Sequence, residues 1–178
     1  SKHLLDLWLL ESKLLGQVCG LKFFNVFGPN EYHKGFMSSF VYKAYNQIKE
    51  TGSVKLFMSH HPDYRDGEPV RDFIYVKDCL EVIWWFVKNH RVNGIFNLGT
   101  GKARSWNDLA MATFKAMGVQ PTIEYIEMPE SIRNQYQYFT QATMDKLKQA
   151  GCPVQFGPLE EGVRDYVQNY LSNPWQHL

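Results

Sequence analysis

The segment from Lys22 to Pro29 constrains the fold of this chain more than any other part of the sequence. Its residues are Lys-Phe-Phe-Asn-Val-Phe-Gly-Pro, an apolar run that stops at a glycine and a proline. Because Gly-Pro interrupts regular structure, we expect a buried strand over 21–26 that opens into a loop. The polar side chains of Asn25 and Lys34 would then lie where the strand opens.

Helical and strand patterns alternate along the rest of the chain. Near its start, apolar residues recur at intervals of three and four, which predicts a helix over 4–15 with one buried face. Those residues are Leu4, Leu5, Trp8, Leu9 and Leu15. We expect further helices over 36–49, 76–89, 106–117, 143–150 and 159–171. We expect further strands over 54–58, 70–76, 94–98 and 122–126, with a loop over 59–70 and a loop over 128–138 that can include a short helix.

Two local signals support this assignment. Ser105 is a good N-cap for the helix over 106–117, and Asp108 stands at the capping-box position. Gly52 is placed to close the helix over 36–49. Strands that alternate with helices indicate the α/β class.

Composition excludes several partners. Hydrophobic residues make up 44% and charged residues 21%, which is typical of a globular chain. The net charge of +1 supplies no general attraction for nucleic acid or anionic lipid. No apolar run reaches the roughly 18 residues of a membrane span, and no signal peptide is evident. The three cysteines, Cys19, Cys79 and Cys152, favour buried reduced thiols in a cytoplasmic protein over a disulfide.

Three segments together resemble a known family. They are Lys22–Pro29, Arg71-Asp72-Phe73-Ile74-Tyr75-Val76 and Phe96-Asn97-Leu98-Gly99-Thr100-Gly101. In this order they resemble the C-terminal half of the extended short-chain dehydrogenases, the NAD-dependent epimerase/dehydratase family. The motif His33-Lys34-Gly35 is similar to that of the ADP-heptose epimerases within it.

The resemblance implies a Rossmann-type domain joined to a small α/β substrate domain. Residues 1–30 would end the Rossmann domain. Residues 31–178 would be mainly substrate domain, with returning Rossmann elements near 70–100. The chain opens within a helix without a cap or an initiator methionine, and it lacks a Gly-x-Gly-x-x-Gly motif. We therefore expect a fragment without its N-terminal dinucleotide-binding half, inactive by itself.

Lys34 is the principal catalytic candidate. A loop lysine is by default a solvated ammonium with a pKa of about 10.4, and acid/base work near neutrality needs a lower value. The resemblance implies that Lys34 is an acid/base group that also contacts the cofactor. It assigns Lys2 to the lysine of a Tyr-x-x-x-Lys pair, which holds the cofactor, although a surface lysine at the chain start is the simpler interpretation. Asn25 would contact substrate, and the Val26 backbone would contact the cofactor.

Further substrate contacts follow from the same resemblance. Arg71 would contact the nucleotide diphosphate, although an arginine at a strand end usually forms a surface ion pair. Asp72 is more simply structural. The remaining matches are Phe57, Met58, Ser59, His60 and Tyr136, for which ordinary packing is an equal alternative. Phe36 replaces a substrate-contacting serine of the family, and Lys43 replaces a histidine.

Three tempting features are discounted. His60-His61 has no third ligand at metal spacing, so we predict no metal site. Gly99-Thr100-Gly101 lacks the other residues of a phosphate loop. Cys79 has no base near it in the sequence, so it is not proposed as a nucleophile.

In the whole enzyme the resemblance implies NADP-dependent epimerisation at C6 of ADP-D-glycero-D-manno-heptose, by transient oxidation and hydride return, for the lipopolysaccharide core. It also implies a homo-oligomer. Two alternatives stay open: another nucleotide-sugar epimerase or dehydratase of the same superfamily, or a non-catalytic module that binds a nucleotide sugar.

Overall fold

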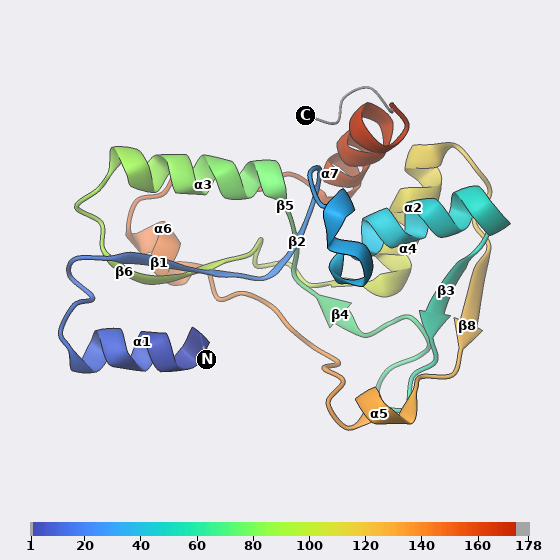
Figure 1. Ribbon diagram of the computed structural model, residues 1–178, viewed down its shortest axis with the longest axis horizontal. Helices are drawn as coiled ribbons and strands as arrows, with labels where there is room; N and C mark the ends of the chain where they lie inside the picture. The colour runs from blue at the N-terminus through green and yellow to red at the C-terminus, as the bar shows by residue number, and fades with distance from the viewer. Residues whose placement is uncertain (1, 174–178) are drawn as a thin grey trace.

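The computed structural model describes residues 2–173, which form an α/β fold with two regions (Figure 1). In the first region, β1 (Cys19–Phe23) and β6 (Gly94–Leu98) pair in parallel, with Leu21 opposite Phe96. Helices α3 (Val76–Lys88) and α1 (Lys2–Glu11) lie on opposite sides of this pair (Figure 1). Helix α6 (Asp145–Gln149) packs beside β6.

The second region is built mainly from helices. Helices α2 (Phe40–Thr51), α4 (Trp106–Met117) and α7 (Leu159–Tyr166) pack together, and a π-helical turn (Val167–Leu171) follows α7. The parallel strands β3 (Val54–Phe57) and β8 (Ile123–Ile126) form its outer edge, and α5 (Glu130–Arg133) lies beyond them (Figure 1).

Two short strand pairs join the regions. Strand β2 (Asn25–Phe27) pairs in parallel with β5 (Phe73–Tyr75), and β4 (Val70–Arg71) pairs antiparallel with β7 (Arg104–Ser105). The predicted strand over 21–26 is therefore divided at Phe24, whose N–H still donates to Leu98 O at 3.0 Å. The chain leaves β6 at that point and takes β5 as its new neighbour.

The predicted strand over 70–76 is likewise divided, at Asp72. Its side chain is fully buried and turned toward backbone N–H groups of another segment, so the local backbone leaves the ladder. Strand β4 then takes β7 as its neighbour, whereas β5 takes β2.

The helix predicted over 36–49 begins later than expected. Residues Tyr32–Met37 form a 3-10 helix, and α2 begins at Phe40, after the N-cap Ser39. It ends at Gly52, whose φ is +75°, as the sequence predicted. The capping box at Ser105 and Asp108 is confirmed, with both reciprocal hydrogen bonds present.

Helix α1 differs from its prediction in a physically informative way. It ends at Glu11, and it buries no side chain; Leu4 is 66% and Trp8 53% exposed. The apolar spacing marks the correct face, but no described element covers that face. The prediction of a buried face is therefore wrong for residues 2–173.

The core consists of three clusters of buried side chains. One lies between α3, β6 and α6, a second between β2, β5, α4 and α7, and a third between α2, α4 and β3. Cys79 belongs to the first cluster, and burial raises the pKa of its thiol to about 12. Cys19 is exposed, contrary to the prediction that all three thiols are buried.

Gly28 makes the loop after β2 possible. Its φ is +147°, and a Cβ there would lie 2.3 Å from Val76 Cγ1. A larger residue would therefore push the loop away from the start of α3. Within residues 2–173 no helix is both long and apolar enough to cross a membrane.

Candidate functional site

A cavity of about 410 Å³ opens where the chain passes from β1 to β2. Strand β1 ends here: Phe24, the residue after it, lines the cavity and donates its N–H to Leu98 O at the end of the parallel strand β6. The carboxyl ends of such strands are where α/β proteins place their ligands. Asn25 and Val26 line the cavity from β2, Lys34 from the 3-10 helix, and Lys43 from α2. The structure thus brings four of the predicted site residues to one place.

Lys34 is positioned by the tight turn that follows Pro29. Its N–H donates to Glu31 O at 3.0 Å. The next residue, Gly35, has φ +53° and ψ −123°, which kinks the 3-10 helix. The Lys34 side chain lines the cavity from an exposed position. Among the described residues, Lys34 therefore faces the cavity but is not buried.

Glu31 is a buried carboxylate in the cavity wall that the sequence analysis missed. It is 5% exposed and accepts hydrogen bonds from Ser39 N at 2.6 Å and Ser39 Oγ at 2.5 Å. Tyr166 Oη, 135 residues later, donates to it at 3.0 Å. Burial, and then the Glu31 carboxylate, raise the pKa of Tyr166, so the phenol stays protonated. Glu31 therefore ties the Lys34 turn to the N-terminus of α2 and to α7.

Arg71 lies behind the cavity wall rather than on the surface. It is only 7% exposed, and its guanidinium lies 5.8 Å from the Trp106 ring and 5.4 Å from the Tyr136 ring. It donates to the carbonyl of Val70 at 2.9 Å and to that of Gln137. Among residues 2–173 no carboxylate forms an ion pair with it. The alternative interpretation of Arg71, a surface ion pair, is therefore wrong for the described residues.

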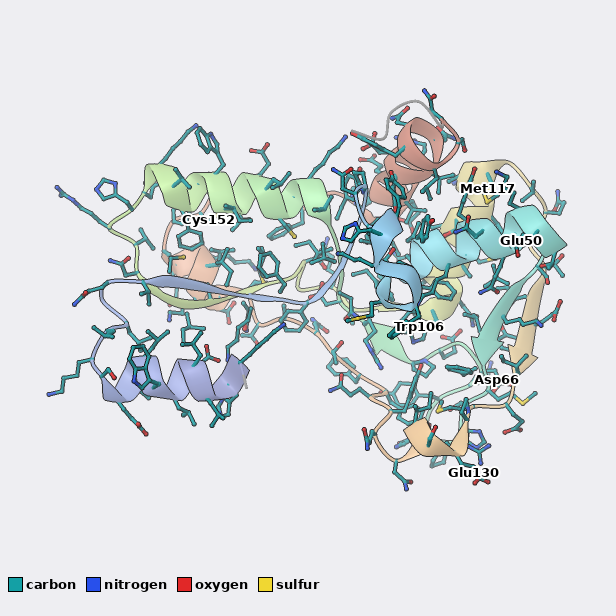
Figure 2. The ribbon with its side chains drawn as sticks, in the orientation of Figure 1. Glu50, Asp66, Trp106, Met117, Glu130 and Cys152 are labelled. Carbon is teal, nitrogen blue, oxygen red and sulfur yellow. The ribbon has the colours of Figure 1, made fainter. Side chains whose placement is uncertain are left out.

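Trp106, labelled in Figure 2, connects Arg71 with the cavity. It lines the cavity at the start of α4, and its ring meets those of Phe40 at 5.4 Å and Phe73 at 5.2 Å, edge to face. Burial lowers the pKa of Arg71, although nothing in a protein deprotonates a guanidinium near neutrality. A buried cation without a carboxylate partner, next to an open cavity, is well suited to an anionic ligand.

The comparison with known proteins identifies the family. Residues 1–99, more than half of the chain, match the model of the NAD dependent epimerase/dehydratase family. The chain belongs to this family.

Individual relatives refine the comparison. An ADP-L-glycero-D-manno-heptose-6-epimerase from Nitratidesulfovibrio vulgaris (strain DP4) is 60% identical over 172 residues, which are 97% of this chain and 53% of the relative. The crystal structure of the Helicobacter pylori ADP-L-glycero-D-manno-heptose-6-epimerase has a TM-score of 0.72 at 27% identity, covering 92% of this chain and 48% of that one. The chain therefore spans about half the length of the curated relatives it matches.

A more distant structure shares the fold. The UDP-glucose 4-epimerase of Thermus thermophilus, in complex with NAD, has a TM-score of 0.69 at 23% identity, covering 93% of this chain and 50% of that one.

The other predicted contacts of this family member lie away from the cavity. Phe36 is 87% exposed, and neither it nor Lys2, on the first turn of α1, is among the cavity-lining residues. Residues 57–60 lie at the end of β3, where His60 Nε2 is 3.3 Å from Glu127 Oε2 and His60 N donates to Tyr138 Oη at 3.3 Å.

The Gly99-Thr100-Gly101 turn is filled by Asp72. The Asp72 carboxylate accepts hydrogen bonds from Thr100 N at 2.7 Å, Thr100 Oγ1 at 2.6 Å, Gly101 N at 2.9 Å and Ala142 N at 3.0 Å. Those N–H groups are therefore unavailable to a phosphate, and the structural role predicted for Asp72 is confirmed. Within residues 2–173 no three metal-ligating side chains gather in one place.

Proposed function

We propose that this chain supplies the substrate half of an ADP-heptose 6-epimerase that serves lipopolysaccharide core synthesis. The observation that carries the proposal is the convergence of Asn25, Lys34 and Lys43 on one cavity, next to the buried cation of Arg71. The 60% identity to a protein of that name supports the choice of substrate. Domain boundaries are part of the proposal: residues 1–30 end the Rossmann domain, and residues 31–178 are mainly substrate domain with returning elements near 70–100.

The nucleotide sugar would lie along a line from the cavity to Arg71. The heptose would occupy the cavity, whose volume of about 410 Å³ is sufficient for a sugar. The diphosphate would lie toward Arg71 and Lys43, where a planar guanidinium and an ammonium match phosphate oxygens. Asn25, the first residue of β2, can donate its amide N–H to a sugar hydroxyl.

NADP is the cofactor that we infer, and the described residues 2–173 offer contacts for its nicotinamide end. Val26 and Lys34 line the cavity and would lie against the nicotinamide end. Lys2 would add a further cofactor contact if α1 is extended by a preceding segment. The glycine turn at 99–101 would not bind the cofactor phosphates, because its N–H groups donate to Asp72. When bound, this cofactor supplies reversible hydride acceptance at the sugar carbon.

Lys34 would move the proton that accompanies this chemistry. It would serve one of the two epimeric C6 hydroxyls, taking the proton from that hydroxyl in one direction of the reaction and giving a proton to the oxygen in the other. Lys34 is exposed within residues 2–173, so the bound ligand or a covering segment would have to exclude water from the cavity during the transfer. Glu31 would hold the turn in place during both transfers.

The experiment is a chimaera that joins these 178 residues to the part of the Nitratidesulfovibrio relative that they do not match. With NADP, it should convert ADP-D-glycero- to ADP-L-glycero-D-manno-heptose, followed by proton NMR. Lys34→Met should lower the rate by about a hundredfold or more, the usual contribution of an acid/base group. Lys49→Met, an exposed lysine of the last turn of α2, is the matched control and should leave the rate unchanged.

Two results would contradict the proposal. Full activity of the Lys34→Met chimaera would remove Lys34 from the chemistry. Turnover of UDP- or GDP-sugars without turnover of ADP-heptose would instead favour another epimerase or dehydratase of the superfamily.

A further inference from the structure

A further cavity, of about 570 Å³, lies beside α6 and the loop that follows β6; we call it the second cavity. Three segments enclose it: the loop over 100–104, helix α6, and the segment over 152–159 that leads into α7. Among the described residues, Phe73 alone lines both the second cavity and the candidate site. The second cavity is therefore a separate space, and its volume lies in the range of small-molecule sites.

The inner wall of the second cavity is apolar. Its buried members are Phe73, Met144, Leu147 and Leu159, and its half-buried members are Val154 and Phe156. Val154 and Phe156 pack against the core cluster between α3, β6 and α6, which accounts for their burial. That packing still leaves a cavity much larger than the voids of a protein interior, so it has room for the apolar group of a ligand.

Cations line the more exposed part of the second cavity. They are Lys102, Lys148 and Arg104, and among the described lining residues there is no carboxylate. Arg104 is held by Asp108 Oδ2 at 3.0 Å and by Glu160 Oε1 at 2.7 Å. Lys102 and Lys148 are exposed, and neither forms an ion pair with a carboxylate of residues 2–173. Two ammonium groups are therefore available to an anion that enters beside the apolar wall.

Hydrogen bonds fix the segments around the second cavity before any ligand binds. Asp72 holds the turn at Thr100, as described above, and Lys102 N donates to Thr100 Oγ1 at 3.1 Å. On the other side, Cys152 N donates to Leu147 O at 3.3 Å, which fixes the segment after α6. Figure 2 labels Cys152 beside this helix. A preformed site loses little conformational entropy when it binds a ligand.

We propose that the second cavity binds a phosphate monoester that carries a small apolar body, such as an aryl or short alkyl group. The body would lie against the apolar wall at Leu147 and Phe156, where it is removed from water. The phosphate would lie toward Lys102 and Lys148, because two ammonium groups match the charge of a dianion. Neither Lys34 nor Arg71 lines the second cavity, so the inference does not depend on the proposed function.

Calorimetric titration of the 178-residue chain with phenyl phosphate, inorganic phosphate and benzyl alcohol tests the inference. Phenyl phosphate should bind about tenfold or more tightly than either of the others, because it alone combines the charge with a ring to bury. Lys102→Met and Lys148→Met should each weaken its binding about threefold to fivefold. Lys49→Met is the matched control, because this exposed lysine lines neither cavity and should leave the affinity unchanged.

The thiol of Cys152 reports where the probe binds. Cys152 lines the second cavity, whereas Cys19 is exposed on β1 and Cys79 is buried. Alkylation by iodoacetamide, followed by peptide mass spectrometry, gives a rate for each thiol. Phenyl phosphate at ten times its dissociation constant should slow the alkylation of Cys152 about tenfold and leave that of Cys19 unchanged.

Several results would overturn the inference. Equal alkylation of Cys152 with and without phenyl phosphate, or no alkylation of Cys152 at all, would mean that the probe does not enter the second cavity. Equal affinities for phenyl phosphate and inorganic phosphate would remove the apolar wall from binding. Tighter binding of 3-phenylpropionate than of phenyl phosphate would overturn the choice of a phosphate. Binding that is lost in Lys34→Met but kept in Lys148→Met would place the probe in the candidate site instead.

Discussion

Asp72→Asn is the substitution that most sharply tests how this fold is held together. Asp72 is fully buried, and each of its two carboxylate oxygens accepts two hydrogen bonds. An amide can keep its oxygen toward Thr100, but its NH₂ group must then face the N–H groups of Gly101 and Ala142. Two buried donors would lose their acceptor, at about 1–3 kcal/mol each. The expected loss is therefore about 4 kcal/mol of the free energy of unfolding, out of a typical 5–15 kcal/mol.

Urea denaturation followed by circular dichroism measures this loss. The midpoint should fall strongly at an unchanged slope, because the surface exposed on unfolding is the same. Asp63→Asn is the control: this carboxylate is 81% exposed, and its replacement should stay within about 0.5 kcal/mol. A loss of less than about 1 kcal/mol for Asp72→Asn would refute the reasoning, since it would mean that the four hydrogen bonds do not link β4, β5 and the turn at 99–101.

Two further predictions concern α7 and α4. Burial raises the pKa of Asp165, but hydrogen bonds from Lys77, Tyr75 and Asn169 outweigh it, and the net pKa is lowered. The stability from this group is present above the unfolded value of about 3.9 and is lost as the pH falls through the lower folded value. The difference in unfolding free energy between the unmodified chain and Asp165→Asn should therefore shrink between about pH 5 and pH 2; a constant difference would contradict this linkage. Ser105→Ala removes the N-cap of α4 and should cost about 1 kcal/mol in urea denaturation, whereas an unchanged midpoint would mean that the capping box contributes nothing.

Local signals in the sequence were sufficient for much of the fold. Ser105 and Asp108 specify the start of α4 within a few residues, and the apolar runs over 54–58 and 94–98 became β3 and β6. These elements depend on neighbouring residues, so periodicity and capping predict them.

The divisions at Phe24 and Asp72 could not be predicted in this way. Each arises because two halves of one predicted strand pair with different strands, and strand pairing joins residues far apart in the sequence. The exposed face of α1 has a related cause: spacing identifies an apolar face but does not say whether a described element covers it.

The candidate site likewise has residues that local motifs predict and residues that only distant contacts reveal. Family motifs identified Asn25 and Lys34 as candidate site residues, and both line the same cavity in the structure. The role of Glu31 in the cavity wall was not predicted, because its partner Tyr166 lies 135 residues later. No local sequence pattern indicates a carboxylate that is buried by such a distant contact. The burial of Arg71 between two rings also depends on segments distant in sequence.

The most direct test of the central claim is a ¹⁵N NMR titration of this chain with ADP-heptose. If the cavity between β2 and the 3-10 helix binds the nucleotide sugar, the side-chain amide of Asn25 and the indole N–H of Trp106 should shift together and saturate at one affinity. The indole of Trp84, exposed on α3 and absent from the cavity lining, should not move. Unmoved signals of Asn25 and Trp106 at saturating ligand, or shifts confined to α3, would contradict the placement of the substrate in this cavity.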